Sequence, residues 1–548
     1  MESPPMTSAL NSLDLQIQWS RLVSIMDEAD VAMLQSAFST IVSDSRDYAV
    51  ILLDSHARAI AQAKVCVPAF TTSLPVAART MLEMFPPATL KQGDVLITND
   101  PWICHGHLPD FYVIIPIFHD GQIAAYYAAA AHMSDIGGRL DELIARDVYE
   151  EGLRVPPSKL YEAGKPNDQL IRIIEANVRH PRLVVGDVGA MVGAGHLVAA
   201  RCQEFISDYG ANSIDIVGAE ILTRSETAMR NAIAAVPDGT YAQTVACDGF
   251  GEPVSISLAL TIAGDTLKMD FTGSSQQREG ASINCVFNVT HAHSIFALKC
   301  AFLPDLPNNE GLYMPIETVA PLGSILNARF PAPVKARSMT SFHLHTAVFG
   351  ALVSVMPDRV QAAAGSFWVM AMTGRDDEGE AFAVHVLPNG GTGAVMSSDG
   401  QPTMSFPGQG TITPAEIIEN RGPILVTERS LREDSGGAGT SRGGLGQTIR
   451  IRTLGQASTR VTLRADKVTY PPTGLAGGLP GGAGTVRLNG QPFPLDPFIL
   501  GPGDELSLHL PGGGGYGDPK KRDKAKLAHD IQQGFVTSEV ADTLYGGL

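Results

Sequence analysis

The chain has 548 residues, of which 56 are glycine, 36 are proline and only 6% are aromatic, and it carries a formal net charge of −17 at pH 7. A surface this acidic repels phosphate backbones, so nucleic-acid binding is excluded as an expected function. No uninterrupted apolar run reaches the ~18–20 residues of a membrane span, so the sequence predicts no membrane association.

The N-terminal part is predicted to be helical. Its start lacks a basic region followed by an apolar one, so no signal peptide is expected. Six scattered cysteines form no CxxC pair and no disulfide framework. Together these features predict a cytoplasmic protein. Apolar residues near helical spacing then predict a helix over 15–45, and a stretch of strand character follows at 50–53.

Next come three apolar runs of strand length, at 96–97, 111–118 and 123–131. The last two flank Asp120-Gly121, a strong two-residue hairpin signal. If these residues form the turn, paired positions sum to 241, so that Pro109 lies opposite His132 and His107 is a diagonal neighbour on the same face. Diagonal Cβ atoms are roughly 7–8 Å apart, a distance that two long side chains can close onto one ion.

Histidines are concentrated in this hairpin region. Four of the fourteen lie between positions 105 and 132, and Asp110 stands where Pro109 should disturb the strand alternation. Two imidazoles and one carboxylate with open positions suit Mn, Fe(II) or Zn, and such a set can polarise a carbonyl or activate water. The spacing leaves open the alternative that these are buried histidines hydrogen-bonded to the backbone.

The remainder of the chain divides into regions of different predicted secondary structure. Helix-like stretches at 168–174, 188–207 and 214–235 are followed by strands and turns over 239–395, interrupted by one helix at about 288–302. A glycine-rich β region at 436–517 precedes a helical tail at 520–543. We therefore expect an α+β, multi-lobed, strand- and turn-rich chain with helical N-terminal and middle segments. Its expected lobes are 1–238, holding the metal site, 239–430, mixed and β-rich, and 431–548, glycine-rich with a C-terminal helix.

Two further patterns are expected to be structural. The run GGAGTSRGGLG lacks the Gly-Lys-Ser/Thr ending of a P-loop, so its glycines are attributed to turns with positive φ and to close strand packing. His343 and His345 lie two apart on one predicted strand face, and helical spacing separates His291 from His293 by about 200°. We expect these four histidines to be core or interface residues.

Segment 99–138 resembles the hydantoinase B/oxoprolinase family, whose pattern runs N-D-P-Y-x-G-G-T-H-x-x-D and, after a hairpin, A-H-x-x-D-I-G-G. Four more blocks are similar to motifs of the same family in the same order, namely residues 46–63, 321–337, 434–447 and 511–519. The resemblance therefore covers most of the chain.

The resemblance implies that the chain is the B-type subunit of a two-component enzyme. Its partner, a hydantoinase A-type subunit, binds and consumes ATP. It implies a divalent metal (Mn, Zn or Fe) held by His107, Asp110 and His132, with Asp47 completing the shell. Asp135 would orient His132 or act as general base, or alternatively cap the turn that follows it. The implied enzyme is a hetero-oligomeric hydrolase that opens a small cyclic amide after the partner has phosphorylated it.

Two other functions stay open under the same resemblance: a subunit of an ATP-dependent, biotin-independent ketone carboxylase, and a structural or substrate-binding subunit. The sequence also departs from the family pattern. Cys104-His105-Gly106 replaces G-G-T, and Phe70 stands where P-x-H-x-G-S has histidine. If the histidine at this position contacts the substrate in relatives, Phe70 predicts a more apolar pocket here, which would fit a different or less polar ring. Cys104 could be a ligand or a nucleophile, but we expect it to line the site.

Overall fold

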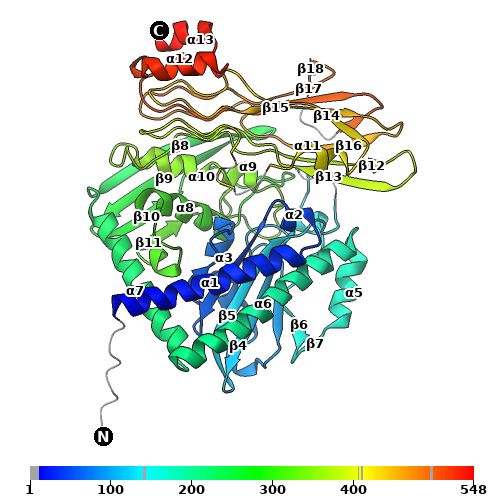
Figure 1. The fold of residues 1–548 in the computed structure, drawn as a ribbon, viewed down its shortest axis with the longest axis vertical. Helices are drawn as coiled ribbons and strands as arrows, with labels where there is room; N and C mark the ends of the chain where they lie inside the picture. Colours follow the sequence, from blue (N-terminus) through cyan, green and yellow to red (C-terminus); the bar gives the residue numbers. More distant parts are fainter. Residues whose placement is uncertain (1–10, 140–142, 405, 409–411, 494–497) are drawn as a thin grey trace.

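The computed structural model describes residues 11–139, 143–404, 406–408, 412–493 and 498–548. The chain forms three lobes: the first and second lie side by side, and the third lies across both of them, with the C-terminal helices at its outer edge (Figure 1). Each lobe has its own buried apolar cluster, formed mostly by residues 15–222 in the first lobe, 229–360 in the second and 368–510 in the third. The fold is thus α+β, as predicted from the sequence.

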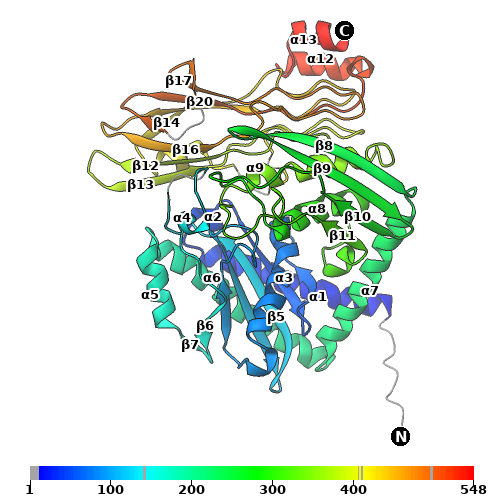
Figure 2. The ribbon, with the colours of Figure 1, turned by 180° about the vertical axis from the view of Figure 1, so that it is seen from behind.

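A seven-stranded antiparallel sheet forms the centre of the first lobe, in the order β2-β1-β5-β4-β3-β6-β7. Its strands are β1 Tyr48–Asp54, β2 Ala59–Gln62, β3 Val95–Thr98, β4 Asp110–His119, β5 Gln122–His132, β6 Ser158–Glu162 and β7 Lys165–Pro166. Helix α6 covers one face and helix α3 the other (Figures 1 and 2). Because both faces are covered, β1 and most of β4 and β5 are buried without alternation.

The helices of the first lobe are α1 Ser12–Ser36, α2 Thr40–Ser43, α3 Pro68–Met84, η1 Pro87–Thr89, α4 Val148–Glu151, α5 Asp168–Asn177, α6 Pro181–Tyr209 and α7 Ser213–Ala234. The helix predicted over 15–45 is interrupted, because Ala37 is extended and Ser39 caps a new helix by accepting from the Val42 N–H. Among the described residues, α6 is the one helix long and apolar enough to cross a membrane. Half of its most apolar stretch is buried, however, and the helix packs on α1, β4 and β5.

The second lobe is a four-stranded sheet, ordered β11-β10-β9-β8, packed against helices. Its elements are β8 Gly239–Phe250, β9 Glu252–Ala263, β10 Thr266–Asp270, β11 Ile316–Val319, α8 Phe287–Phe302, η2 Glu310–Tyr313, α9 Ser338–Ser341 and α10 Leu344–Leu352. Helix α8 matches the interval predicted at 288–302. The strand predicted around His343 and His345 is wrong, because both residues belong to the helical turn and helix of α10.

The third lobe contains two sheets, ordered β13-β12-β16-β19 and β14-β15-β20-β17-β18. Its strands are β12 Val369–Arg375, β13 Ala381–Val386, β14 Ile424–Leu431, β15 Gln447–Thr453, β16 Thr459–Arg464, β17 Thr485–Leu488, β18 Gln491–Pro492, β19 Phe498–Leu500 and β20 Glu505–His509. Its helices are α11 Ala415–Glu419, η3 Pro519–Lys521, α12 Lys524–Gln532 and α13 Ser538–Tyr545. Strand β12 pairs with β13 on one side and with β16 on the other, and β16 pairs with β19. The first of these sheets therefore combines residues from both sides of position 430.

Glycine allows extended segments of the third lobe to pack backbone against backbone. A Cβ atom on Gly513 would lie 1.9 Å from the carbonyl oxygen of Thr392, and one on Gly391 would lie 1.9 Å from that of Gly444. None of the glycines in the 436–446 run has a positive φ. Close chain approach, and not left-handed turns, therefore explains this glycine run, which corrects half of the sequence interpretation.

Candidate metal centre

The predicted hairpin forms, but a bulge changes its register. Asp120 and Gly121 make the turn, and His119 pairs with Gln122 as expected. Between Ile117 and Phe118 the register shifts by one residue, so Asp110, and not Pro109, lies opposite His132. This correction places a carboxylate and an imidazole directly across two strands, where Cβ atoms are ~4.5–5.5 Å apart.

His107 reaches the same point from the segment that leads into β4. Its Nε2 lies 2.9 Å from Asp110 Oδ1, and the same oxygen lies 3.0 Å from His132 Nδ1. Ligand atoms ~2.1 Å from one ion are about 3.0 Å apart when they occupy adjacent corners of an octahedron. The three predicted ligands therefore have the spacing of a two-histidine, one-carboxylate metal site, and they form one of two such groups among the described residues.

The proton positions also suit a metal. The Nδ1 atom of His107 lies 2.9 Å from the carbonyl oxygen of Lys335, which can only accept, so Nδ1 carries the proton and Nε2 presents a lone pair. Burial, together with the charge of Arg337, lowers the pKa of His107 to about 3. Nε2 is buried and has no hydrogen-bond partner of suitable geometry among the described residues. A cation would satisfy it.

Asp110 is held in its ionised form. Burial opposes ionisation, but His107 and Arg337 outweigh it and lower the pKa of Asp110 well below its usual range. The Arg337 Nη2 donates to Asp110 Oδ2 at 2.9 Å, while Oδ1 faces the two imidazoles. A neutral imidazole and a carboxylate thus direct lone pairs at one point. Lys335 and Arg337 lie in the block at 321–337, but no pattern in the sequence predicted a role for either residue.

Asp47 and Asp135 differ in how they relate to this cluster. Asp47 Oδ2 lies 4.0 Å from His132 Nδ1, and its backbone carbonyl accepts the His132 N–H at 3.0 Å. Asp135 instead accepts from the Gly137 N–H at 3.2 Å and from Arg179 Nη1 at 2.7 Å, and its second oxygen accepts the Arg179 backbone N–H. These contacts correspond to the turn-capping alternative for Asp135, because both of its oxygens are engaged.

The other candidates in the histidine-rich segment are separate from the cluster. Cys104 is fully buried, its thiol lies 3.9 Å from the Thr98 carbonyl oxygen, and burial raises the pKa of this thiol well above its usual value. A protonated thiol is neither a good ligand nor a good nucleophile. His119 contacts Gln203 near the tip of the hairpin. His105 is buried against Phe70, with ring centroids 5.4 Å apart.

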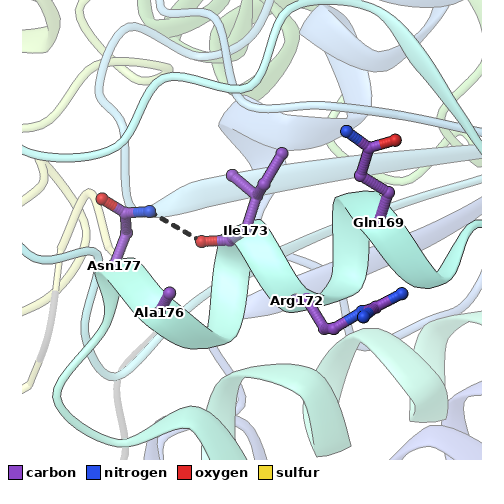
Figure 3. Close-up of a pocket in the computed structure, with 5 residues that line it drawn as sticks. All are labelled: Gln169, Arg172, Ile173, Ala176 and Asn177. Carbon is purple, nitrogen blue, oxygen red and sulfur yellow. Dashed lines mark hydrogen bonds between the residues drawn. The ribbon is translucent and has the colours of Figure 1, made fainter.

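A shallow hollow lies elsewhere on the molecule, along one side of α5 (Figure 3). Its lining residues are Gln169, Arg172, Ile173, Ala176 and Asn177. All five come from one helix, and the Asn177 amide is already bonded to the Ile173 carbonyl oxygen at 2.7 Å. Its lining includes no histidine, cysteine or carboxylate, so it offers no alternative to the centre at His107, Asp110 and His132.

Comparison with known proteins gives a consistent result along the whole chain. The model of the hydantoinase B/oxoprolinase family matches residues 11–519. A Pseudomonas protein assigned as the B-type component of a D-/L-hydantoinase is 29% identical, over 98% of this chain and 95% of that protein.

Two solved structures share the fold. The ATP-dependent caprolactamase of Pseudomonas jessenii has a TM-score of 0.90 and 26% identity, over 98% of this chain and 96% of that chain. An acetone carboxylase in its nucleotide-free state has a TM-score of 0.87 over 97% of this chain and 79% of that chain, at 19% identity, which shows likeness of fold alone.

Proposed function

Because the chain belongs to the hydantoinase B/oxoprolinase family, we propose that it is the metal-holding subunit of a two-component, ATP-dependent cyclic amide hydrolase. The observation that carries this proposal is the pair of lone pairs that His107 Nε2 and Asp110 Oδ1 direct at one another across 2.9 Å in a buried site. The names of the related D-/L-hydantoinase component and of the caprolactamase support the substrate class.

The need for ATP follows from the chemistry of the substrate. An unstrained cyclic amide is a poor electrophile, and phosphorylation of its oxygen creates a leaving group and activates the carbonyl carbon. We infer that a hydantoinase A-type ATPase subunit performs this phosphorylation, because the glycine runs of this chain lack the Lys-Ser/Thr ending of a P-loop. The proposal includes a hetero-oligomer in the cytoplasm, where ATP is available.

In this proposal His107, Asp110 and His132 hold the divalent metal (Mn, Zn or Fe), with Asp47 as a further ligand. When bound, such an ion polarises a carbonyl and lowers the pKa of water. The chain itself supplies orientation. The Lys335 carbonyl fixes the tautomer of His107, and Arg337 leaves only one oxygen of Asp110 facing the imidazoles.

Asp47 is the group best placed to move a proton if it is not a ligand. Its side chain is 36% exposed and its Oδ2 lies 4.0 Å from His132 Nδ1, so it is open to solvent on one side and to the cluster on the other. Asp135, whose oxygens are occupied by the Gly137 and Arg179 donors, is proposed to hold the turn after β5 and not to act as general base.

The direct test is reconstitution with a hydantoinase A-type subunit. Ring opening of hydantoin or caprolactam should require the two subunits together with ATP and a divalent metal. The ATPase subunit alone should release at most phosphate. Ring opening by that subunit in the absence of this chain would overturn the proposal.

The second candidate is a subunit of an ATP-dependent ketone carboxylase, which the fold shared with acetone carboxylase favours. The two candidates differ in their co-substrate. Hydrolysis of a cyclic amide needs no bicarbonate, whereas carboxylation consumes it. ATP turnover by the reconstituted complex that depends on both a ketone and bicarbonate would select the carboxylase.

A further inference from the structure

Three buried histidines outside the metal cluster form a row of neighbouring rings. His105 precedes β4, His293 lies on α8 and His345 lies on α10. Their ring centroids are 5.4 Å apart between His105 and His293, and 5.3 Å apart between His293 and His345. All three are buried, with exposed fractions of 3%, 6% and 2%. We call these residues the imidazole row.

The row contains polar atoms without partners. His105 Nδ1 and both ring nitrogens of His345 are buried and have no hydrogen-bond partner among the described residues. Leaving a buried donor or acceptor unpaired is energetically unfavourable. Burial also lowers the pKa of His293 to about 3 and that of His345 well below its usual value, so these rings are neutral near pH 7. The row therefore offers uncharged, unsatisfied donors and acceptors.

Phenylalanine rings surround the row. Phe70 meets His105 edge-on at 5.4 Å, and Phe342 lies 5.6 Å from His293. Phe296 and Phe406 lie 5.3 and 5.6 Å from His345, both at steep angles. Flat apolar surfaces alternating with imidazole nitrogens suit a small ring that has polar edges.

Two alternatives fit the row less well. A metal ion requires nitrogens that converge, and the described groups with three possible ligands within 4.8 Å do not include these histidines. An anionic ligand requires a spare cation. The charge of Arg337 is balanced by Asp110 at 2.9 Å, although its Nε has no hydrogen-bond partner among the described residues. Lys467 donates to the Ala364 carbonyl and to Ser366, with Asp466 beside it.

We propose that the imidazole row binds the ring of the substrate, and that this ring is small, nearly planar and uncharged, with an amide N–H and C=O. A neutral imidazole has one donor and one acceptor, which matches an amide edge. His105 is two residues from His107, so a ring on the row lies next to the metal cluster. The proposal rests on the proposed function for its substrate class.

The test compares two ligands that share one ring. 2-Pyrrolidone is uncharged, and 5-oxoproline is the same ring with a carboxylate. Binding is measured by calorimetry on the full chain after metal removal, without the partner subunit. We expect 2-pyrrolidone to bind at least tenfold more tightly than 5-oxoproline, and to shift the side-chain NMR signals of His293 and His345 in ¹⁵N-histidine-labelled protein.

Substitutions of single histidines test whether 2-pyrrolidone binds at the imidazole row. His293→Phe and His345→Phe should each weaken 2-pyrrolidone binding at least tenfold. His291→Phe is the matched control on the same helix, because His291 is already bonded to Thr318 at 3.0 Å and stacks on Phe287. It should leave binding unchanged.

Three results would overturn the proposal: unshifted signals of the row at saturating 2-pyrrolidone, tighter binding of 5-oxoproline, or zinc bound by the row in the His107→Ala/His132→Ala protein. NMR on the unsubstituted chain covers the case in which a variant does not fold. This binding test measures no turnover, whereas the proposed hydrolysis is tested in the reconstituted complex. Failure of the hydrolysis would therefore leave the binding result unaffected.

Discussion

Two clusters in the first lobe bring three possible metal ligands within 4.8 Å, one formed by His107, Asp110 and His132 and the other by Asp54, His56 and Asp215. In the second cluster, Arg58 contacts Asp54 Oδ2 through Nε at 2.7 Å and through Nη2 at 2.6 Å, and Asp54 Oδ1 accepts two backbone N–H groups. Arg58 and these backbone N–H groups therefore already use the negative charge and the lone pairs of Asp54.

The first cluster is arranged differently. Arg337 contacts only Oδ2 of Asp110, and Oδ1 lies 2.9 Å from His107 Nε2 and 3.0 Å from His132 Nδ1. Since His107 Nδ1 carries the proton, Nε2 directs a lone pair at this point. The difference teaches that residue types and spacing do not define a metal site. What distinguishes the first cluster is the buried His107 Nε2, which has no hydrogen-bond partner among the described residues, and the following predictions test this distinction.

The largest effect is expected from the ligands themselves. His107→Ala and His132→Ala should each remove the bound metal and lower turnover of the reconstituted complex by more than the roughly 10–100-fold that loss of a ligand-supporting group costs. Metal content and steady-state turnover are the measurements. A variant that loses its metal but retains turnover would show that the ion is incidental.

A smaller effect is expected from the residue that orients Asp110. Arg337→Met keeps the length of the side chain but frees Oδ2, so metal affinity should fall by roughly 10–100-fold. Competition with a chelator of known affinity measures this change. Arg278→Met, which removes an arginine paired with Glu252 in the second lobe, serves as the control and should have no effect. Equal affinity in both variants would contradict the role of Arg337.

At the second cluster the expected effect is on stability. Arg58→Met leaves the fully buried Asp54 without its cation, which should lower the free energy of unfolding by about 1–2 kcal/mol, less than for a buried pair because Arg58 is 32% exposed. Millimolar Mn²⁺ should restore part of the lost melting temperature in this variant and none in the unsubstituted chain. Absence of any destabilisation would show that Arg58 does not neutralise the cluster.

The smallest effect is expected from Asp215→Asn. Asp215 accepts the backbone N–H and the hydroxyl of Ser55, at 3.0 and 2.7 Å, and an asparagine oxygen can keep one of these bonds. The free energy of unfolding should change by about 1 kcal/mol or less, and metal content should be the same as in the unsubstituted chain. A loss of metal here would reverse the assignment of the two clusters.

Local patterns predicted the elements well. Helix α8 was expected at 288–302 and runs from Phe287 to Phe302, and the Asp120-Gly121 turn forms as the sequence indicates. The bulge at Ile117/Phe118 has no sequence signal of its own, so the pairing of Asp110 with His132 was off by one residue. The three predicted ligands still lie together, because their types and their place at one end of the hairpin survive a shift of one residue.

Contacts between lobes could not be predicted in this way. The imidazole row combines residues from a loop, α8 and α10, which share no sequence period. The two-residue spacing of His343 and His345 is typical of one face of a strand and predicts a strand. The same spacing also occurs in helical turns, which is where the structure places these residues. Likewise, Arg337 reaches Asp110 from 227 positions away in the sequence. Only the tertiary fold brings such residues together.

Anomalous diffraction from crystals of the metal-loaded chain tests the central claim most directly. We predict one strong peak in each chain, between His107, Asp110 and His132, and none at Asp54, His56 and Asp215. A peak at the second cluster, or no peak at the first in protein shown to contain stoichiometric metal, would contradict the account.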